Sequence, residues 1–149
     1  MMDIAYEFEG NFLYYVRLLK RMYERTLSEA AAECGLSFPE ADVLSFLREN
    51  PEFDTARDVA LYREVSRAYV SKAVEMLVQR GYVEVQPDRE DRRYQHLIIT
   101  ESAHGAVDTL HEAQMDFYAR VTRGLTQNEF AAMLSAIGKC AMNLAADEM

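Results

Sequence analysis

The sequence runs Ser66-Arg67-Ala68-Tyr69-Val70-Ser71-Lys72 and then, after residues 73–80, Gly81-Tyr82-Val83-Glu84-Val85 and Asp88-Arg89-Glu90-Asp91-Arg92-Arg93. Ser66 is a residue type that caps helix N-termini and Gly81 a type that ends helices, so we predict a helix over residues 67–80. The alternating residues 82–86 and the β-favouring run 94–100 predict two strands around the charged loop. The stretch therefore predicts a helix followed by a β-hairpin.

The N-terminal third of the chain is predicted to be helical. Apolar residues recur every three or four positions over 4–26, which indicates a long amphipathic first helix that Gly35 would end. Ser37 and Glu40 form a capping-box pattern, which predicts the start of a second helix. Asn50-Pro51 would end it, because proline disfavours helical geometry in the residue before it.

Further capping residues mark the remaining helices. Asp54 or Thr55 would cap a short third helix, and Thr100 would cap a fifth helix after the hairpin. Thr126 with Glu129 is a second capping box and would open a sixth helix. We therefore expect a mostly α fold with one small β-hairpin.

The third and fourth helices, joined by residues 63–65, form a candidate helix-turn-helix. Its packed side is predicted to consist of Val59, Ala60, Val65, Val70, Val74 and Leu77. The residues expected to be exposed at the start of the fourth helix are Ser66, Arg67, Ala68, Tyr69, Ser71 and Lys72. These types contact phosphates and base edges in DNA grooves, although the pattern also fits an ordinary solvated amphipathic helix.

The loop of the hairpin brings Arg89, Arg92 and Arg93 close together. Their mutual repulsion favours a nearby anion, and DNA phosphate is such an anion. Acidic residues interspersed in the same loop offer an alternative, because they would compensate the arginines in the free protein. The loop therefore permits DNA contact without requiring it.

The overall charge of −9 is unevenly distributed along the chain. Residues 57–93 carry a net charge of +1, so the remainder carries −10. A phosphate-facing surface needs locally placed arginines, not a basic protein. The charge pattern is therefore compatible with DNA binding by this central segment.

Composition excludes several other classes of protein. The chain has 149 residues, half of them hydrophobic, and lacks the roughly 20-residue apolar run that a membrane span requires. Its first residues have no basic region followed by an apolar one, so we expect a cytoplasmic protein without a membrane partner. Cys34 and Cys140 match no metal spacing and are expected to be unpaired, with a redox-sensing role as the alternative. No nucleophile motif or phosphate loop indicates an enzyme, and no cofactor is expected.

Residues 55–100 resemble the winged helix-turn-helix of the MarR family of bacterial transcription regulators. The resemblance is carried by the run from Val70 to Val83, by Asp88 to Arg93 and by Leu97-Ile98-Ile99-Thr100-Glu101. It implies a winged helix-turn-helix within a single domain, 1–149, flanked by dimerisation helices in 1–35 and 101–149. It also implies that Asp91 orients Arg93, which enters the minor groove. Ala103 stands where the family usually has glycine, which leaves the start of the fifth helix open.

A homodimer is expected from the resemblance and from the residues themselves. The last helix carries an apolar stripe formed by Phe130, Met133, Leu134, Ile137, Ala141 and Leu144. This stripe and that of the first helix exceed what a small winged domain can cover. Burial within one chain is the alternative. A two-fold dimer would bind a pseudo-palindrome with half-sites about one helical turn apart.

A small-molecule effector is the remaining expected partner. The resemblance implies a ligand that binds between the dimerisation helices and the DNA-reading heads and changes their separation. Tyr15 on the first helix and Phe46 on the second are candidates for lining such a pocket, with membership of the core as the alternative reading of both.

A metal site is a further candidate on the fifth helix. His104, Asp108, His111 and Glu112 would lie along one flank, and their types suit zinc or another transition metal. The two histidines are two helical turns apart, about 10 Å by the rise of a helix, so a solvated polar flank is the favoured interpretation.

These observations lead to one expected function. The chain is interpreted as a sequence-specific regulator of transcription, acting as a repressor, that binds duplex DNA as a homodimer. The recognition helix would enter the major groove and the wing the minor groove. The alternatives are a winged-helix interaction protein or antirepressor that does not bind DNA, and a metal-responsive regulator.

Overall fold

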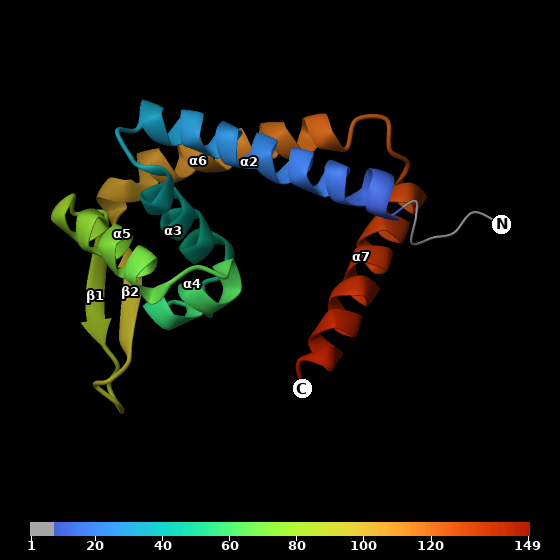
Figure 1. The fold of residues 1–149 in the computed structure, drawn as a ribbon. Helices are drawn as coiled ribbons and strands as arrows, with labels where there is room; N and C mark the ends of the chain where they lie inside the picture. Colours follow the sequence, from blue (N-terminus) through green and yellow to red (C-terminus); the bar gives the residue numbers. More distant parts are fainter. Residues whose placement is uncertain (1–7) are drawn as a thin grey trace. The chain divides into compact units, whose positions relative to one another are not determined.

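The computed structural model describes residues 8–149. The chain is divided into two compact units, with the boundary after Met115. The helical elements before the hairpin are η1 (Phe8–Phe12), α2 (Leu13–Glu33), α3 (Phe38–Glu49), α4 (Ala56–Arg63) and α5 (Arg67–Gln79). The hairpin is β1 (Val83–Pro87) and β2 (Gln95–Ile99), and η2 (Glu101–Ala103), α6 (His104–Val121) and α7 (Gln127–Asp147) follow it (Figure 1). The predicted mostly helical fold with one small hairpin is confirmed.

The caps expected around α3 are present. Gly35 has a φ of +69° and follows the last turn of α2, in the left-handed region that suits glycine. The Ser37 hydroxyl accepts a hydrogen bond from the Glu40 backbone N–H, while the Glu40 carboxylate accepts one from the Ser37 N–H at 3.1 Å. Asn50 is the C-cap, as the Asn50-Pro51 pair predicted. The position of α3 is therefore set by local sequence.

The helix-turn-helix is held by side-chain caps at both of its N-termini. Thr55, not Asp54, caps α4, and it forms a reciprocal capping box with Asp58. The Ser66 hydroxyl caps α5 by accepting from the Tyr69 N–H at 3.0 Å. Glu64, in the turn between the helices, adopts a φ of 52°, which is left-handed and uncommon for a residue with a side chain.

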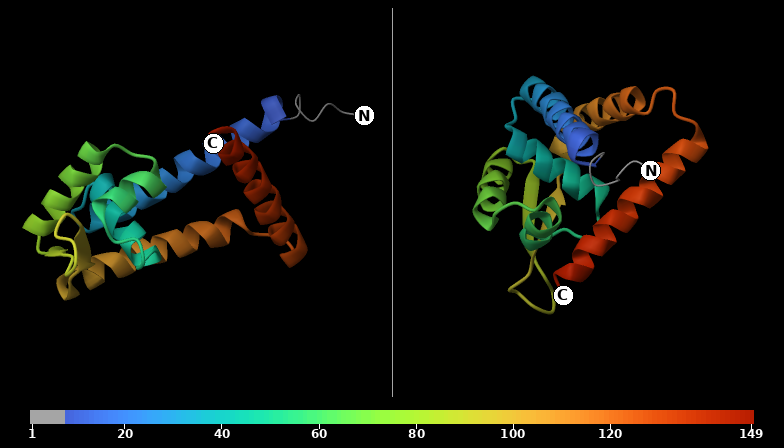
Figure 2. Two further views of the ribbon diagram at one scale, coloured as in Figure 1. Left: turned by 90° about the horizontal axis from the view of Figure 1, so that it is seen from below. Right: turned by 45° about the vertical axis from the view of Figure 1, so that its right-hand side comes forward.

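The two strands form an antiparallel hairpin whose register pairs Val83 with Ile99 and Pro87 with Gln95. The intervening loop (88–94), called the wing loop below, is closed by a hydrogen bond of 2.8 Å from the Asp88 N–H to the Tyr94 carbonyl. The hairpin lies beside α5, and its loop protrudes beyond α4 and α5 (Figures 1 and 2). This arrangement is the predicted wing.

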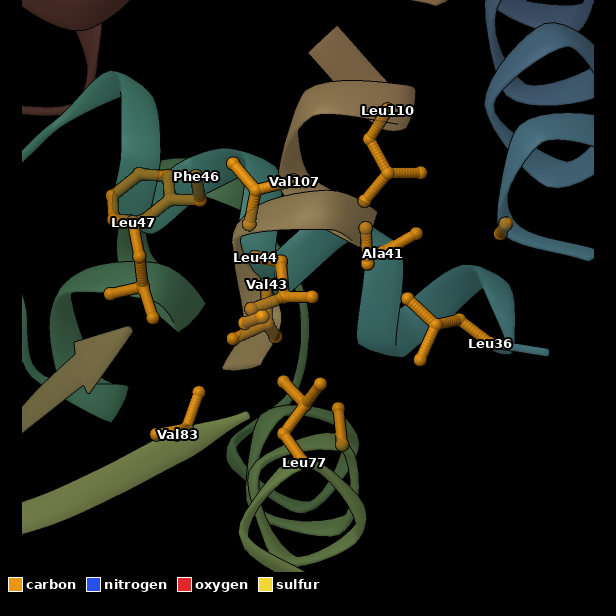
Figure 3. Packing of buried hydrophobic residues seen from close by; sticks show 14 of the residues in the cluster. Leu36, Ala41, Val43, Leu44, Phe46, Leu47, Leu77, Val83, Val107 and Leu110 are labelled. Carbon is orange, nitrogen blue, oxygen red and sulfur yellow. The ribbon is translucent and has the colours of Figure 1, made fainter. Parts of the chain in front are cut away.

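The core of the first unit is built around α3. Leu44 and Phe46 of α3 are buried against Leu77 of α5, Val83 of β1 and Leu110 of α6. Figure 3 shows these side chains converging from the helices and the hairpin on one cluster. The expected inward residues Val59, Val70 and Leu77 are buried, and Val65 and Val74 pack against the cluster while partly exposed. Helix α5 and the hairpin thus share one apolar core.

The junction between the hairpin and α6 differs from the prediction. Thr100 precedes the 3₁₀ turn η2 and makes no side-chain cap; its hydroxyl instead donates to the carbonyl of Gly81. The Ser102 hydroxyl donates to the same carbonyl at 3.0 Å. The Gly81 carbonyl therefore accepts hydrogen bonds from both hydroxyls, which would otherwise be free to cap a helix here. Helix α6 begins only at His104.

The second unit contains the end of α6 and the whole of α7. The predicted capping box is confirmed: Thr126 accepts from the Glu129 N–H at 3.1 Å, and Glu129 accepts from the Thr126 N–H at 2.9 Å. None of the residues of α7 is buried, and Leu144 is 70% exposed. No helix among residues 8–149 is long and apolar enough to cross a membrane.

Candidate nucleic-acid interface

The start of α5 presents a polar edge beside the wing. Ser66 and the arginine and lysine of this edge, Arg67 and Lys72, are exposed together with Ala68 and Ser71. Val70, between them, is fully buried and anchors the helix to the core. The structure therefore places five of the six candidate residues of this helix on an accessible surface.

Tyr69 is the exception, because its side chain is only partly exposed. Its ring packs against the core cluster, and its hydroxyl bonds to Asp42 of α3. Burial, followed by the negative charges of Asp42 and Glu24, raises the pKa of Tyr69 to about 12. The side chain thus points toward α2 and α3 because a tertiary partner outweighs its position on the helix.

The wing loop holds Arg93 by a bidentate ion pair with Asp91. The Arg93 Nη2–Asp91 Oδ2 distance is 2.7 Å and the Arg93 Nε–Asp91 Oδ1 distance is 3.0 Å. These bonds lower the pKa of Asp91 and raise that of Arg93. The Arg93 side chain is nevertheless 88% exposed, so its guanidinium is oriented while remaining open to a ligand.

The other wing arginines, Arg89 and Arg92, are exposed. Within residues 8–149 neither forms an ion pair, and neither do Arg57 and Arg67. The acidic residues of the loop therefore do not neutralise them. Asp91 pairs with Arg93, which leaves the other four guanidinium groups available to an external anion.

Asp88, in the wing loop, accepts hydrogen bonds with both oxygens of its carboxylate. One of its carboxylate oxygens accepts from the backbone N–H groups of Glu90 and Asp91, each at 2.9 Å, and the other bonds to His96 Nε2 at 2.8 Å. The bond to His96 is the main reason that the pKa of Asp88 falls to about 2. His96 Nδ1 bonds in turn to Asp54 at 2.7 Å.

Sequence reasoning missed this contact between Asp54, His96 and Asp88. The contact between His96 and Asp88 had a signal in the sequence, because Asp88 lies two residues beyond Gln86, the cross-strand partner of His96, and successive alternate residues of a hairpin share a face. Asp54 lies 42 residues before His96 and was considered only as a helix cap. Only the packing of α4 against β2 brings it to the imidazole.

An open cavity of about 340 Å³ separates the polar edge of α5 from the wing. Three arginines line it: Arg57 near the start of α4, Arg67 at the start of α5 and Arg93 on the wing. Arg57 was not among the sequence candidates. A hollow surrounded by three guanidinium groups favours an anion, since each of them carries a permanent charge and donates several hydrogen bonds.

The two candidate effector residues differ in burial. Phe46 is a core residue that stacks on Tyr62 with ring centroids 6.1 Å apart. Tyr15 is 60% exposed on α2 and contacts the ring of Tyr14. Phe46 is therefore part of the hydrophobic core, whereas Tyr15 lies on the surface.

A different cavity, of about 550 Å³, lies between α2, α3 and α5. Its lining includes Tyr23, Glu24, Phe38, Asp42, Arg63 and Tyr69. Arg63 pairs with Asp42 at 3.0 Å and with Glu49 at 3.2 Å. The buried amide of Gln114, on α6, donates to Glu49 and to the hydroxyl of Tyr23. A chain of polar contacts thus runs from α6 and α2 through α3 to Tyr69 of α5.

The candidate metal residues lie along α6 without converging. His104, Asp108 and Glu112 are exposed, whereas the Nδ1 atom of His111 is buried. In the described part of the chain no three histidine, cysteine, aspartate or glutamate side chains are close enough to hold one ion.

A family model matches the central segment of the chain, and solved structures match its fold. The model of the MarR family matches residues 35–93. A MarR-family transcriptional regulator from Silicibacter pomeroyi is 21% identical, with 95% of this chain and 96% of that chain covered and a TM-score of 0.80. No curated protein matches.

Two further solved structures are similar, and both hold ligands. A putative MarR-family regulator from Listeria monocytogenes, complexed with a 26mer DNA, is 18% identical, covers 99% of this chain and 92% of its own, and has a TM-score of 0.81. CouR from Rhodococcus jostii RHA1, bound to p-coumaroyl-CoA, is 20% identical, covers 89% of this chain and 93% of its own, and has a TM-score of 0.76. The match to the MarR-family model thus covers residues 35–93, and nearly the whole chain has a fold similar to that of these solved structures.

Proposed function

We propose that this protein regulates transcription by binding duplex DNA. The observation that carries the proposal is the arginine-lined cavity between the polar edge of α5 and the wing. Arg57, Arg67 and Arg93 surround it from three elements. A DNA backbone offers phosphates that three such groups can bind together, while α5 occupies the major groove and the wing arginine the minor groove.

The local charge balance supports contact with DNA over an ordinary solvated surface. The exposed arginines 57, 67, 89 and 92 have no acidic partner in the described part of the chain. Arg93 is oriented by Asp91 and still exposed. An oriented guanidinium, such as that of Arg93, loses little conformational freedom on meeting phosphate, and the uncompensated ones release the counterions of the phosphate when they bind it. The similar Listeria protein, which carries DNA, supports the same assignment.

The protein acts as a homodimer in this proposal. Within its unit, α7 buries no residue, and its stripe from Phe130 to Leu144 is exposed. On α2, Leu13, Val16 and Leu19 are exposed as well. A second copy would cover these apolar faces, and the two-fold symmetry of the pair would match a pseudo-palindromic operator.

A small-molecule effector would bind in the cavity between α2, α3 and α5. Tyr69, in the first turn of the recognition helix, and Asp42, in the middle of the polar chain, line it. A ligand that displaces the contact between them would bias the position of α5 relative to α2 and α6. The bound ligand of the similar CouR structure supports an effector, and loss of DNA affinity on binding would make the protein a repressor.

Selection of bound sequences from a random duplex library tests the DNA-binding proposal. The purified full chain should enrich a pseudo-palindrome at near-physiological salt, because affinity depends steeply on salt. The same selection with Arg93→Ala should enrich the site weakly. Enrichment of no sequence, with the arginine variant equal to the wild type, would instead favour an interaction protein that keeps the winged fold.

A further inference from the structure

His96 lies between two carboxylates that come from different parts of the fold. Its Nδ1 atom is 2.7 Å from Asp54 Oδ1, in the segment before α4, and its Nε2 atom is 2.8 Å from Asp88 Oδ1, in the wing loop. The imidazole therefore links the segment before α4 to the wing loop through side chains, in addition to the backbone hydrogen bond of 2.7 Å from the Leu97 N–H to the Asp54 carbonyl. His96 and the two aspartates are called the carboxylate clamp below.

The clamp requires a protonated imidazole. A neutral imidazole has one N–H donor, and an ionised carboxylate can only accept, so a neutral His96 satisfies one aspartate and repels the other. An imidazolium donates to both. The hydrogen bonds from Asp54 and then Asp88 accordingly raise the pKa of His96, even though its side chain is 35% exposed.

The clamp reaches the DNA-contacting arginine through the wing loop. The carboxylate of Asp88 that bonds to His96 also receives the backbone N–H groups of Glu90 and Asp91. Asp91 in turn accepts hydrogen bonds from Nε and Nη2, along one edge of the Arg93 guanidinium. A shift of Asp88 away from His96 is therefore transmitted to Arg93 through backbone hydrogen bonds within one tight loop.

We propose that the His96 imidazolium positions the wing for DNA binding, so that loss of its proton releases the wing loop and lowers DNA affinity. The inference rests on the proposed function, because the wing must contact DNA for its position to matter. His96 touches no DNA in this mechanism. It acts through Asp88, Asp91 and Arg93.

Few other charged groups face His96. On β1, its cross-strand partner Gln86 is neutral, and Glu84 lies farther along the same face, opposite Ile98. On α4, Asp58 is occupied by the Thr55 cap and Arg57 lines the adjacent cavity. The acidic residues of α3 next to the hairpin pair with arginines: Glu40 with Arg80, and Asp42 and Glu49 with Arg63. Asp54 and Asp88 therefore dominate the imidazole.

The sign of the pH effect follows from the raised pKa. The clamp is complete below the ordinary histidine pKa of 6.5 and is lost as pH rises through the higher pKa of folded His96. Asp88 remains ionised across this range because its pKa is about 2. DNA affinity should thus be highest on the acidic side of the transition and fall toward alkaline pH.

The test measures two quantities on the full-length protein over about pH 6 to about pH 9 at constant salt. The first is affinity for the selected duplex, and the second is the pKa of each histidine by NMR. We expect affinity to fall about tenfold, with a midpoint equal to the NMR pKa of His96. His104→Gln, which changes an exposed histidine of α6, is the matched control and should leave the pH dependence of affinity unchanged.

His96→Gln should lower affinity at acidic pH about tenfold and remove the pH-dependent component that His104→Gln retains. Any pH dependence that arises elsewhere in the chain is common to both variants and cancels in the comparison. Hydrogen exchange of the backbone N–H groups of Glu90 and Asp91 should accelerate in His96→Gln, which reports release of the loop itself.

Asp54→Asn separates positioning from simple electrostatics. It removes a negative charge near the DNA, so charge alone would strengthen binding at every pH. The clamp requires the opposite: the pKa of His96 falls, the affinity midpoint moves to lower pH with it, and binding weakens near neutral pH. This variant also carries the test if His96→Gln does not fold.

The possible results distinguish the two proposals. A wild type that binds its duplex with equal affinity across the range, or an Asp54→Asn variant that binds more tightly throughout, would overturn the clamp and leave DNA binding intact. A wild type that selects no duplex at any pH would overturn both. The positioning role would be established if the midpoint of DNA affinity equals the NMR pKa of His96 and both move to lower pH in Asp54→Asn.

Discussion

Glu40, near the start of α3, forms an ion pair with Arg80, which follows the last residue of α5, across 40 positions of sequence. The Glu40 side chain is only 3% exposed, yet two nitrogens of the Arg80 guanidinium reach it. Burial alone would raise the pKa of Glu40, but hydrogen bonds from Arg80 and Ser37 outweigh it and the pKa lies below 4.5. One carboxylate thus caps α3 and fixes the end of the recognition helix.

Arg80→Met should lower the free energy of unfolding by about 2 kcal/mol at neutral pH, because it leaves a buried carboxylate without its charged partner. The native pair stabilises the fold above the ordinary carboxylate pKa of 4.5 and loses that contribution as pH falls through the lower folded pKa. The cost of the substitution should therefore shrink toward about pH 4. Urea unfolding at several pH values measures it.

Arg25→Met is the matched control for that experiment. Arg25 and Glu29 form an exposed ion pair on α2, with side chains 70% and 67% exposed. Such pairs contribute little in water, so a change below about 0.5 kcal/mol is expected. Equal losses in the two variants would argue against a special role for the buried pair.

Arg93→Ala should weaken binding to the selected duplex about thirtyfold while leaving the oligomeric state unchanged. Arg93→Lys should recover little of the loss, because an ammonium group cannot reproduce the bidentate contact that Nε and Nη2 make with Asp91. Fluorescence anisotropy with a labelled duplex measures both variants. Arg48→Ala, at an exposed arginine of α3, controls for the loss of one charge, and an equal effect there would remove the special role of the wing.

Arg57→Ala should weaken binding to all duplexes to a similar degree, because a phosphate contact carries no sequence information. The plot of log affinity against log salt should become less steep by about 1. Arg67→Ala and Lys72→Ala provide the contrast, since either one relaxes sequence preference if it contacts a base. A sequence-dependent loss in Arg57→Ala would show that Arg57 does more than bind phosphate.

Ile137→Glu should dissociate the proposed homodimer and with it most of the affinity for a two-half-site duplex. The residue lies in the middle of the exposed apolar stripe of α7, where a carboxylate would be buried on association. Ser135→Glu introduces the same group on the opposite face of the helix and should leave the dimer intact. Sedimentation velocity distinguishes the states, and a dimeric Ile137→Glu protein would place the interface elsewhere.

The elements that the sequence predicted well are those defined by local chemistry. Ser37, Ser66 and Thr126 cap their helices as expected because each bonds to the backbone three residues ahead. Gly35 and Gly81 take the left-handed geometry that their positions require. The hairpin follows from alternation and β-propensity within a few residues.

The features that escaped prediction depend on distant partners. Helical periodicity placed Tyr69 on the exposed edge, but Asp42 on another helix draws its hydroxyl inward. Thr100 has the right type for a cap and bonds instead to a carbonyl that another turn supplies. Asp54 finds His96 only after α4 packs against β2. No local pattern specifies any of these three pairings.

The complete exposure of α7 has a consequence for the quantity of protein that a cell must keep. If association alone covers the stripe around Ile137 and Leu144, the stability of this helix follows mass action and rises with protein concentration. At low abundance the helix would open, and proteases would cleave it there first. A regulator built in this way would be removed fastest when it is scarce, so its level would tend toward either depletion or saturation of its sites.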